Sequence, residues 1–378
     1  MFHWRQTRAP SSVMMDEIEP SSNENEKQAS YPLHQFFLYD NLLPDQLATL
    51  SLFKNQIQES DDFCTMCKND LTLLRFLRAR NFDLGKATFM LQESLKWRKE
   101  FDVEHITTVE QFPFSQELAQ YYPRGFHGID KCGRPIYIDC IGKLQLDKAL
   151  QVAERSTLLR RYAQEYEFLS QIILPACSIQ AKRTIEQTFT IVDLRGLTFS
   201  MFNMTTKRYI SDMAGMSQNN YPEILGEMCF IGVSRFFRII WAFLKNLLDA
   251  RTESKITLLC CNDKWREYLL ERIDAHQLPL FLGGTRDCDD TWSNMDFGPW
   301  MDPKILQQVY QQNNTIPKNL FRLSFVEILE KDFDEFFRQF IKKEETSSLQ
   351  LTQPASGDIS DSSETTNERS DTDRVVEL

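Results

Sequence analysis

The chain has 378 residues, of which 42% are hydrophobic and 26% are charged, and its formal net charge is −11. This length allows one large domain or two modest ones. Most of the negative charge lies near the ends: residues 344–378 carry nine acidic and two basic side chains, and residues 1–30 carry five acidic and three basic ones. The body between them is nearly neutral, which argues against broad nucleic-acid binding, since that needs a basic footprint.

Both ends are polar and poor in aromatic residues, so we expect residues 1–30 and 344–378 to be disordered tails. The amino-terminal segment lacks the apolar stretch of a signal peptide, and no uncharged apolar run reaches the length of a transmembrane helix. Nine cysteines at irregular spacing are typical of reduced thiols. The sequence therefore predicts a cytoplasmic protein.

A helical lobe is predicted over residues 31–105. Apolar residues recur there at steps of three or four, which is the period of an amphipathic helix. Pro44 stands where a helix can begin, because a proline fits the first helical position. The predicted helices cover residues 44–57, 71–80 and 87–97.

An α/β domain is predicted over residues 106–305, because strands there alternate with helices. A turn at residues 127–135 leads into its first strand. The predicted strands cover residues 136–141, 188–192, 228–231 and 256–261. The predicted helices cover residues 155–174, 204–217 and 264–273, the first of them ended by Pro175. A C-terminal helical extension is expected over residues 306–343, with a Phe-rich amphipathic helix over residues 321–343.

The stretch 236–248 (FFRIIWAFLKNLL) predicts a short, mostly apolar helix. At about 1.5 Å per residue it spans roughly 20 Å, which is less than the ~30 Å hydrocarbon core of a bilayer. Polar residues suited to a phosphate flank it, with Tyr221-Pro222-Glu223 before it and Thr252 and Lys255 after it. This arrangement suits a molecule with fatty chains and a charged head.

Several motifs occur along the chain in a characteristic order. They include LLRFLRAR at residues 73–80, DKCGRP at 130–135, LPACS at 174–178, IVDLRG at 191–196, QNNYPE at 218–223 and GPW at 298–300. In these motifs the chain resembles the CRAL-TRIO lipid-binding family, in particular its Sec-fourteen-like branch of phosphatidylinositol/phosphatidylcholine transfer proteins.

The resemblance implies a helical lobe packed on an α/β lobe, whose sheet forms the floor of a lipid pocket beneath a mobile gate helix. The gate side chains would be Phe236, Phe237, Ile240, Phe243, Leu244, Leu247 and Leu248. It also implies a monomeric carrier, not an enzyme, that holds a phospholipid without other cofactors. Such a carrier visits membranes transiently, serves vesicle traffic at the Golgi and supplies a phosphatidylinositol kinase. The alternative is a lipid-sensing scaffold that transfers nothing in bulk.

The family's phosphatidylinositol head-group site maps onto Arg80, Glu223, Asp249, Thr252 and Lys255. An ammonium and a hydroxyl group suit a phosphodiester, and inositol hydroxyls can donate to the carboxylates. Asn81 stands where this branch often has a second base. The alternative is a salt bridge between Arg80 and Glu223 that joins the lobes, with Lys255 solvated.

The family's phosphatidylcholine site maps onto Phe126, Tyr137, Tyr166, Thr188 and Thr190. Aromatic rings favour a trimethylammonium group, and the hydroxyl groups can bind the phosphate. Phe126 replaces a tyrosine and so lacks one donor. The alternative is an ordinary aromatic core, and phosphatidylcholine is the second choice of lipid.

One enzyme remains as a remote alternative. The stretch 229–235 fits the C-x-x-G-x-x-R phosphate loop of cysteine phosphatases, with Cys229 as nucleophile and Arg235 as phosphate ligand. A methionine precedes the cysteine where such enzymes have a histidine, and no general acid of the WPD type is present. The five histidines have no metal-ligand spacing, so we expect no catalytic residue and no metal.

Overall fold

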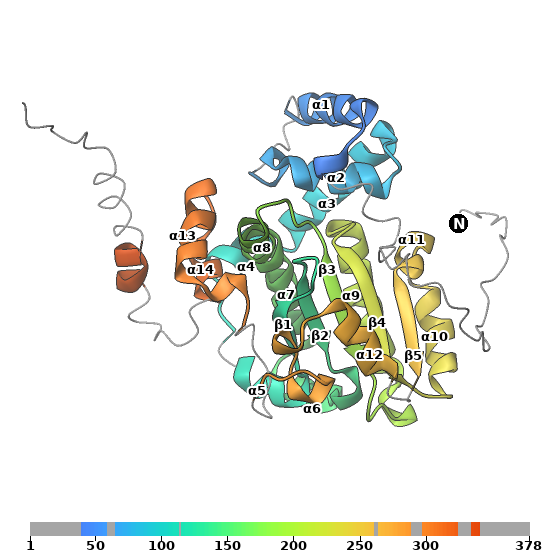
Figure 1. Ribbon diagram of the computed structural model, residues 1–378. Helices are drawn as coiled ribbons and strands as arrows, with labels where there is room; N and C mark the ends of the chain where they lie inside the picture. Colours follow the sequence, from blue (N-terminus) through green and yellow to red (C-terminus); the bar gives the residue numbers. More distant parts are fainter. Residues whose placement is uncertain are drawn as a thin grey trace, which may run out of the picture.

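The computed structural model describes residues 39–58, 65–112, 115–260, 264–288, 297–323 and 334–340 (Figure 1). The tails predicted over residues 1–30 and 344–378 lie outside these ranges. Within them, no helix is both long enough and apolar enough to cross a bilayer.

Three helices form the amino-terminal lobe at the top of Figure 1: α1 (Pro44–Gln58), α2 (Asp70–Ala79) and α3 (Leu84–Glu100). Asn69 and Asp83 cap the amino ends of α2 and α3, each with a side-chain oxygen that accepts a backbone N–H. The three helices share one apolar core that includes Phe53, Leu74 and Leu91. The predicted helical lobe is confirmed.

A five-stranded sheet forms the centre of the larger lobe. Its strands lie side by side in chain order: β1 (Arg124–Ile129), β2 (Pro135–Asp139), β3 (Thr188–Asp193), β4 (Leu225–Val233) and β5 (Ile256–Cys260). β1 is antiparallel to β2, and the other pairs are parallel. Helices connect the parallel strands, as such pairing requires. The predicted α/β class is confirmed, but β1 was not predicted, and residues 127–129 belong to it rather than to a turn.

One face of the sheet is a continuous apolar layer. It packs against α12 (Lys264–Arg272), and Ile136, Phe189, Ile191 and Cys229 contribute to its core. Because side chains alternate along a strand, the neighbouring residues face the other side. The register places Phe126, Tyr137, Thr190, Met228 and Ile256 in one row across all five strands of that second face.

The remaining helices surround the second face and the edges of the sheet. α13 packs on α8 at the β1 side, and α10 and α11 lie beside β5 (Figure 1). The full set of these surrounding helices is α4 (Val103–Thr108), α5 (Ser115–Tyr121), α6 (Leu146–Val152), α7 (Arg155–Phe168), α8 (Leu174–Ala181), α9 (Met204–Asn220), α10 (Phe237–Lys245), α11 (Ala250–Ser254), α13 (Pro303–Gln312) and α14 (Lys318–Arg322).

The prediction that Pro175 ends a helix is wrong. A π-helical turn over Leu169–Ile173 follows α7, and α8 then begins at Leu174 with Pro175 in its first turn. A proline is tolerated there because the hydrogen-bond pattern changes between the two segments, and its missing N–H lies at this change. The chain continues helically to Ala181.

The C-terminal extension packs on the second-face core. Phe321 of α14 and Phe337 have ring centroids 5.4 Å apart, and Tyr310 of α13 contacts both rings. The predicted helix over residues 321–343 is described only in part. α14 already begins at Lys318, residues 334–340 are helical, and the stretch between lies outside the described residues.

Candidate functional site

Glu223 stands at the centre of the polar cluster predicted to bind an inositol head group. Its φ of +59° lies in the left-handed region, which residues other than glycine seldom adopt. One carboxylate oxygen accepts from Lys255 Nζ at 3.1 Å, and the other accepts from Arg251 Nη1 at 2.8 Å. Two cations therefore bind the Glu223 carboxylate, and these contacts offset the cost of the unfavourable backbone conformation at this residue.

Lys255 ends α11 and is buried, with only 6% of its surface exposed. Its ammonium also donates to the Leu225 carbonyl at 2.7 Å. An ammonium has three donors, and the contacts with described residues use two of them. Among the described residues the third donor has no partner. Lys255 is thus not the solvated lysine of the alternative interpretation.

Arg251 was not predicted as a site residue, yet it joins the two lobes. Its guanidinium donates to Glu223, to the Arg78 carbonyl at 2.6 Å and to the Asn81 side chain. Asn81 and Arg78 lie at the end of α2, so Arg251 makes the contact between the lobes that the alternative interpretation gave to Arg80. In the stretch ARTESK, only Thr252 and Lys255 were predicted to bind the head group. Nothing in the sequence distinguished Arg251 from a solvated arginine.

Asp249 and Thr252 form a second unit of the cluster. Asp249 is the N-cap of α11 and accepts from both the Thr252 amide and the Thr252 hydroxyl, each at 2.8 Å. Burial alone would raise the pKa of the Asp249 carboxyl, but these hydrogen bonds lower it below its usual value. Asp249 is therefore an ionised acceptor at neutral pH.

Arg80 lies apart from these contacts. It follows α2, and among the described residues its side chain hydrogen-bonds only to the carbonyl of Ala79, at 2.9 Å. It occupies the same turn as Asn81, which Arg251 contacts. The structure thus brings Glu223, Lys255, Asp249 and Thr252 together in two pairs and places Arg80 at their margin.

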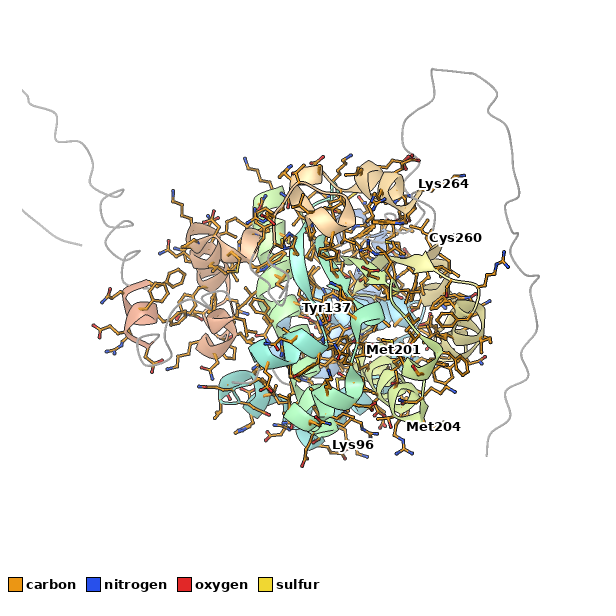
Figure 2. The ribbon with its side chains drawn as sticks, turned by 90° about the horizontal axis from the view of Figure 1, so that it is seen from below. Lys96, Tyr137, Met201, Met204, Cys260 and Lys264 are labelled. Atoms are coloured by element: carbon orange, nitrogen blue, oxygen red, sulfur yellow. The ribbon has the colours of Figure 1, made fainter. Side chains whose placement is uncertain are left out.

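The residues predicted to bind choline lie on the second face of the sheet. Phe126, Tyr137 and Thr190 are direct neighbours across β1, β2 and β3, and the first two rings have centroids 4.9 Å apart. Thr188 and Thr190 are both buried on β3. In Figure 2 the partly buried Tyr137 is labelled near the middle of the molecule, whereas Met204 and Lys264 are labelled toward its edge.

The third predicted ring, Tyr166, comes from α7. Tyr166 stacks on Tyr221 with centroids 4.5 Å apart, and Tyr221 donates to Glu167 at 2.8 Å. Tyr221 belongs to the YPE motif, whose glutamate alone was assigned a role. Because Tyr221 is buried and stacks on Tyr166, it is a further candidate for the aromatic cage. The sequence did not predict this role for Tyr221.

A charged pair closes one end of the aromatic group. Tyr137 donates to Glu165 at 3.4 Å, and Glu165 also accepts from Arg124 at 3.3 Å. The Arg124 guanidinium lies over the rings of Tyr122 and Tyr162, at 4.6 and 5.2 Å from their centroids. The Tyr137 hydroxyl is therefore already oriented by a buried ion pair.

The predicted gate covers the other half of the second face. Phe237 and Ile240 of α10 pack on Val192 and Phe230 of the sheet. Phe236, Phe243, Leu244, Leu247 and Leu248 are all partly buried. The predicted helix over residues 236–248 is too long, because α10 ends at Lys245, and the carbonyl of Leu247 accepts from Gln218 of α9 at 2.6 Å instead.

The phosphatase alternative is wrong. Cys229 is 0% exposed, lies within β4 and faces α12 rather than a loop. Burial raises the pKa of its thiol far above the usual value, whereas a nucleophile needs a thiolate. Arg235 is exposed, beyond the end of the strand.

Comparison with known proteins agrees with this architecture. The model of the CRAL/TRIO domain matches residues 119–284, and that of the CRAL/TRIO N-terminal domain matches residues 47–93. The CRAL-TRIO domain-containing protein YKL091C of Saccharomyces cerevisiae is 34% identical over 70% of this chain and 87% of its own length. The chain belongs to the CRAL-TRIO family.

Relatives with transfer-protein names extend the comparison. The phosphatidylinositol/phosphatidylcholine transfer protein SFH4 of Arabidopsis thaliana is 39% identical over 72% of this chain. The chain spans about half the length of the curated Arabidopsis relatives, 42% of SFH4 and 54% of SFH12. A crystal structure of Sfh5 shares the fold, with a TM-score of 0.51, 16% identity, and coverage of 71% of this chain and 96% of that one.

Proposed function

We propose that this protein binds phospholipids and transfers them between membranes, with phosphatidylinositol as the first ligand and phosphatidylcholine as the second. The observation that carries this proposal is the position of Lys255, a buried ammonium at the end of an apolar sheet face that α10 covers. The names of its Arabidopsis relatives, phosphatidylinositol/phosphatidylcholine transfer proteins, support the same function.

The energetics explain why both features are needed. Extracting a two-chain lipid exposes about 30 methylene groups at ~0.8 kcal/mol each, roughly 24 kcal/mol. Head-group hydrogen bonds of about 1.5–3 kcal/mol each cannot offset this cost. The apolar face beneath α10 must therefore receive the acyl chains, while the polar cluster selects the head group.

In this proposal, different residues of the polar cluster bind the phosphate and the inositol ring. Lys255 binds the phosphate, the Thr252 hydroxyl turns away from Asp249 to donate to it, and Arg80 approaches it from the helical lobe. Glu223 and Asp249 accept from inositol hydroxyls, with Arg251 fixing Glu223. On the second face, Phe126, Tyr137 and Tyr166 surround a choline group while Thr188 and Thr190 donate to its phosphate.

The carrier visits membranes only transiently in this account, remains cytoplasmic and monomeric, and delivers lipid to a phosphatidylinositol kinase at Golgi membranes. It needs no cofactor beyond its lipid. A sensor that retains its lipid would use the same residues, so the deciding observation is transfer rather than binding.

The test is transfer of labelled phosphatidylinositol between vesicles by a Lys255→Ala, Thr252→Val double variant. We expect the rate to fall at least about tenfold, because two charge-assisted hydrogen bonds to the phosphate are lost. Lys264→Ala, which removes an exposed lysine, is the control and keeps the rate. Transfer by the double variant at the wild-type rate would contradict the assigned site.

A further inference from the structure

A small cavity lies among α5, α6, α7 and α9 beside the start of β1, outside the polar cluster around Lys255. Its polar lining comes from Tyr122, Arg124, Arg161 and Tyr209, and leucine and alanine side chains complete it. Guanidinium and phenol groups are hydrogen-bond donors, and none of the described residues that line the space is a carboxylate. The lining therefore favours an occupant that accepts hydrogen bonds.

Two of these donors are buried without a partner among the described residues. They are Arg124 Nη1, on a residue that is 8% exposed, and the Tyr209 hydroxyl, on a residue that is 1% exposed. Leaving a buried donor unsatisfied is costly, and most buried polar groups have a partner. An occupant of the cavity would supply the missing acceptor.

The charge balance around the cavity is positive. Arg124 and Arg161 share a single glutamate, Glu165, with nitrogen–oxygen distances of 3.3 and 3.5 Å. Asp139, the other nearby carboxyl, accepts from Tyr122 at 3.3 Å, and burial raises its pKa to about 7, so at neutral pH it carries only part of a charge. Roughly half of one positive charge is therefore left without a counterpart.

The size of the cavity limits what can bind. It has room for about one or two water molecules, which excludes an inositol, a choline or a phosphate group. We propose that it binds one monovalent, monatomic anion, chloride in the cell, through Arg124 Nη1 and the Tyr209 hydroxyl, with Arg161 supplying further positive charge. A neutral water molecule would satisfy the donors but not the charge.

The bound anion has a defined structural effect. The anion accepts from Arg124 Nη1, while Arg124 Nη2 donates to one oxygen of Glu165. The other oxygen of Glu165 accepts from Tyr137. The anion thereby joins the start of β1 to α7 and α9. This binding is independent of phospholipid, so it can be tested on the purified full chain without lipid.

The experiment measures the melting temperature and the 35Cl NMR line width while chloride replaces gluconate at constant ionic strength, together with anomalous scattering from crystals grown in bromide. We expect a saturable stabilisation, line broadening and one bromide peak beside Arg124. Tyr209→Phe should weaken the affinity roughly tenfold, because a hydrogen bond to a charged group is lost.

Tyr268→Phe, which removes a phenol on α12 beside Glu227, is the matched control and keeps the chloride response. If Tyr209→Phe does not fold, Arg161→Gln provides the same comparison from a partly exposed position. Water in place of bromide in the cavity would overturn the proposal. So would an equal chloride response in the wild type and in the cavity variant.

Discussion

Glu223 is the residue on which the polar cluster depends. Its carboxylate neutralises the buried ammonium of Lys255, and both side chains are nearly inaccessible to water. Glu223→Gln keeps the shape but removes the charge, so we expect the free energy of unfolding to fall by about 3 kcal/mol, as when a buried ion pair is broken. Urea denaturation measures this loss.

Glu253→Gln is the matched control for Glu223→Gln. Glu253 pairs with Lys245 at 2.7 Å, but both groups are exposed, and such pairs contribute only about 0–1 kcal/mol. If the two variants lose equal free energy of unfolding, burial does not strengthen the ion pair between Lys255 and Glu223, and the prediction is contradicted.

Asp139 gives the protein a predictable response to pH. Burial raises its pKa to about 7, although the charge of Arg124 and the hydrogen bond from Tyr122 oppose the shift. A carboxyl whose pKa is higher in the folded state binds its proton more tightly there, so the free energy of unfolding falls as pH rises from about 4 to 7.

Asp139→Asn replaces this carboxyl by a neutral group of similar shape. We expect the variant to be more stable than the wild type by about 1–3 kcal/mol at pH 8 and to lose most of this advantage at pH 5. Thermal melts at pH 5, 6.5 and 8 measure the difference, and an advantage that does not change with pH would contradict the assignment.

Single residues show how far the sequence could predict the candidate site. Glu223 lies in the QNNYPE motif and Lys255 follows the predicted apolar helix, and the structure places the two in direct contact. Arg251 lies in no motif and makes its contacts with the end of α2, about 170 residues earlier. Pairing between residues so distant in the chain depends on how the lobes pack, which hydrophobic periodicity does not report.

At the scale of elements, α10 presents two different faces. Phe237 and Ile240 face the sheet, whereas Ile239 is 62% exposed and points away from it. If α10 is the gate, its outer face meets the bilayer first, so we expect Ile239→Asp to abolish vesicle binding. A charge at the membrane costs several kcal/mol there but little on the free protein.

The melting temperature separates these two effects. Ile239→Asp should keep it, because the side chain is exposed, whereas Phe237→Asp should lower it strongly by burying a charge. Vesicle co-sedimentation measures the membrane contact. Unchanged sedimentation of Ile239→Asp would show that α10 does not meet the membrane through this face.

The elements that were mispredicted share a physical cause. β1 reads RGFHGI and has two glycines and two basic residues, so it lacks the alternating pattern of a half-buried strand, yet cross-strand pairing with β2 stabilises it. Pro175 resembled a helix end because a preceding π-turn has no sequence signature. The strongly periodic helices of the amino-terminal lobe were predicted within a few residues.

For the whole molecule, the two lobes meet through a buried ion pair and a partly exposed polar contact, as well as through apolar contacts. Arg78 of α2 pairs with Glu186, just before β3, and Arg251 joins the end of α2 to α11. The helices of the amino-terminal lobe and the strands β2 to β5 were predictable from the sequence, because each has a local signature, whereas β1 was not. The contacts between the lobes were not, since each depends on pairs of residues far apart in the chain.

The measurement that tests the account most directly is native mass spectrometry of the purified protein with identification of the released lipids. We predict one phosphatidylinositol or phosphatidylcholine molecule per chain for the wild type. The Lys255→Ala, Thr252→Val variant should lose phosphatidylinositol and keep phosphatidylcholine, because the two head groups use different residues. A protein without lipid, or a variant with the same lipids in the same proportion as the wild type, would contradict the account.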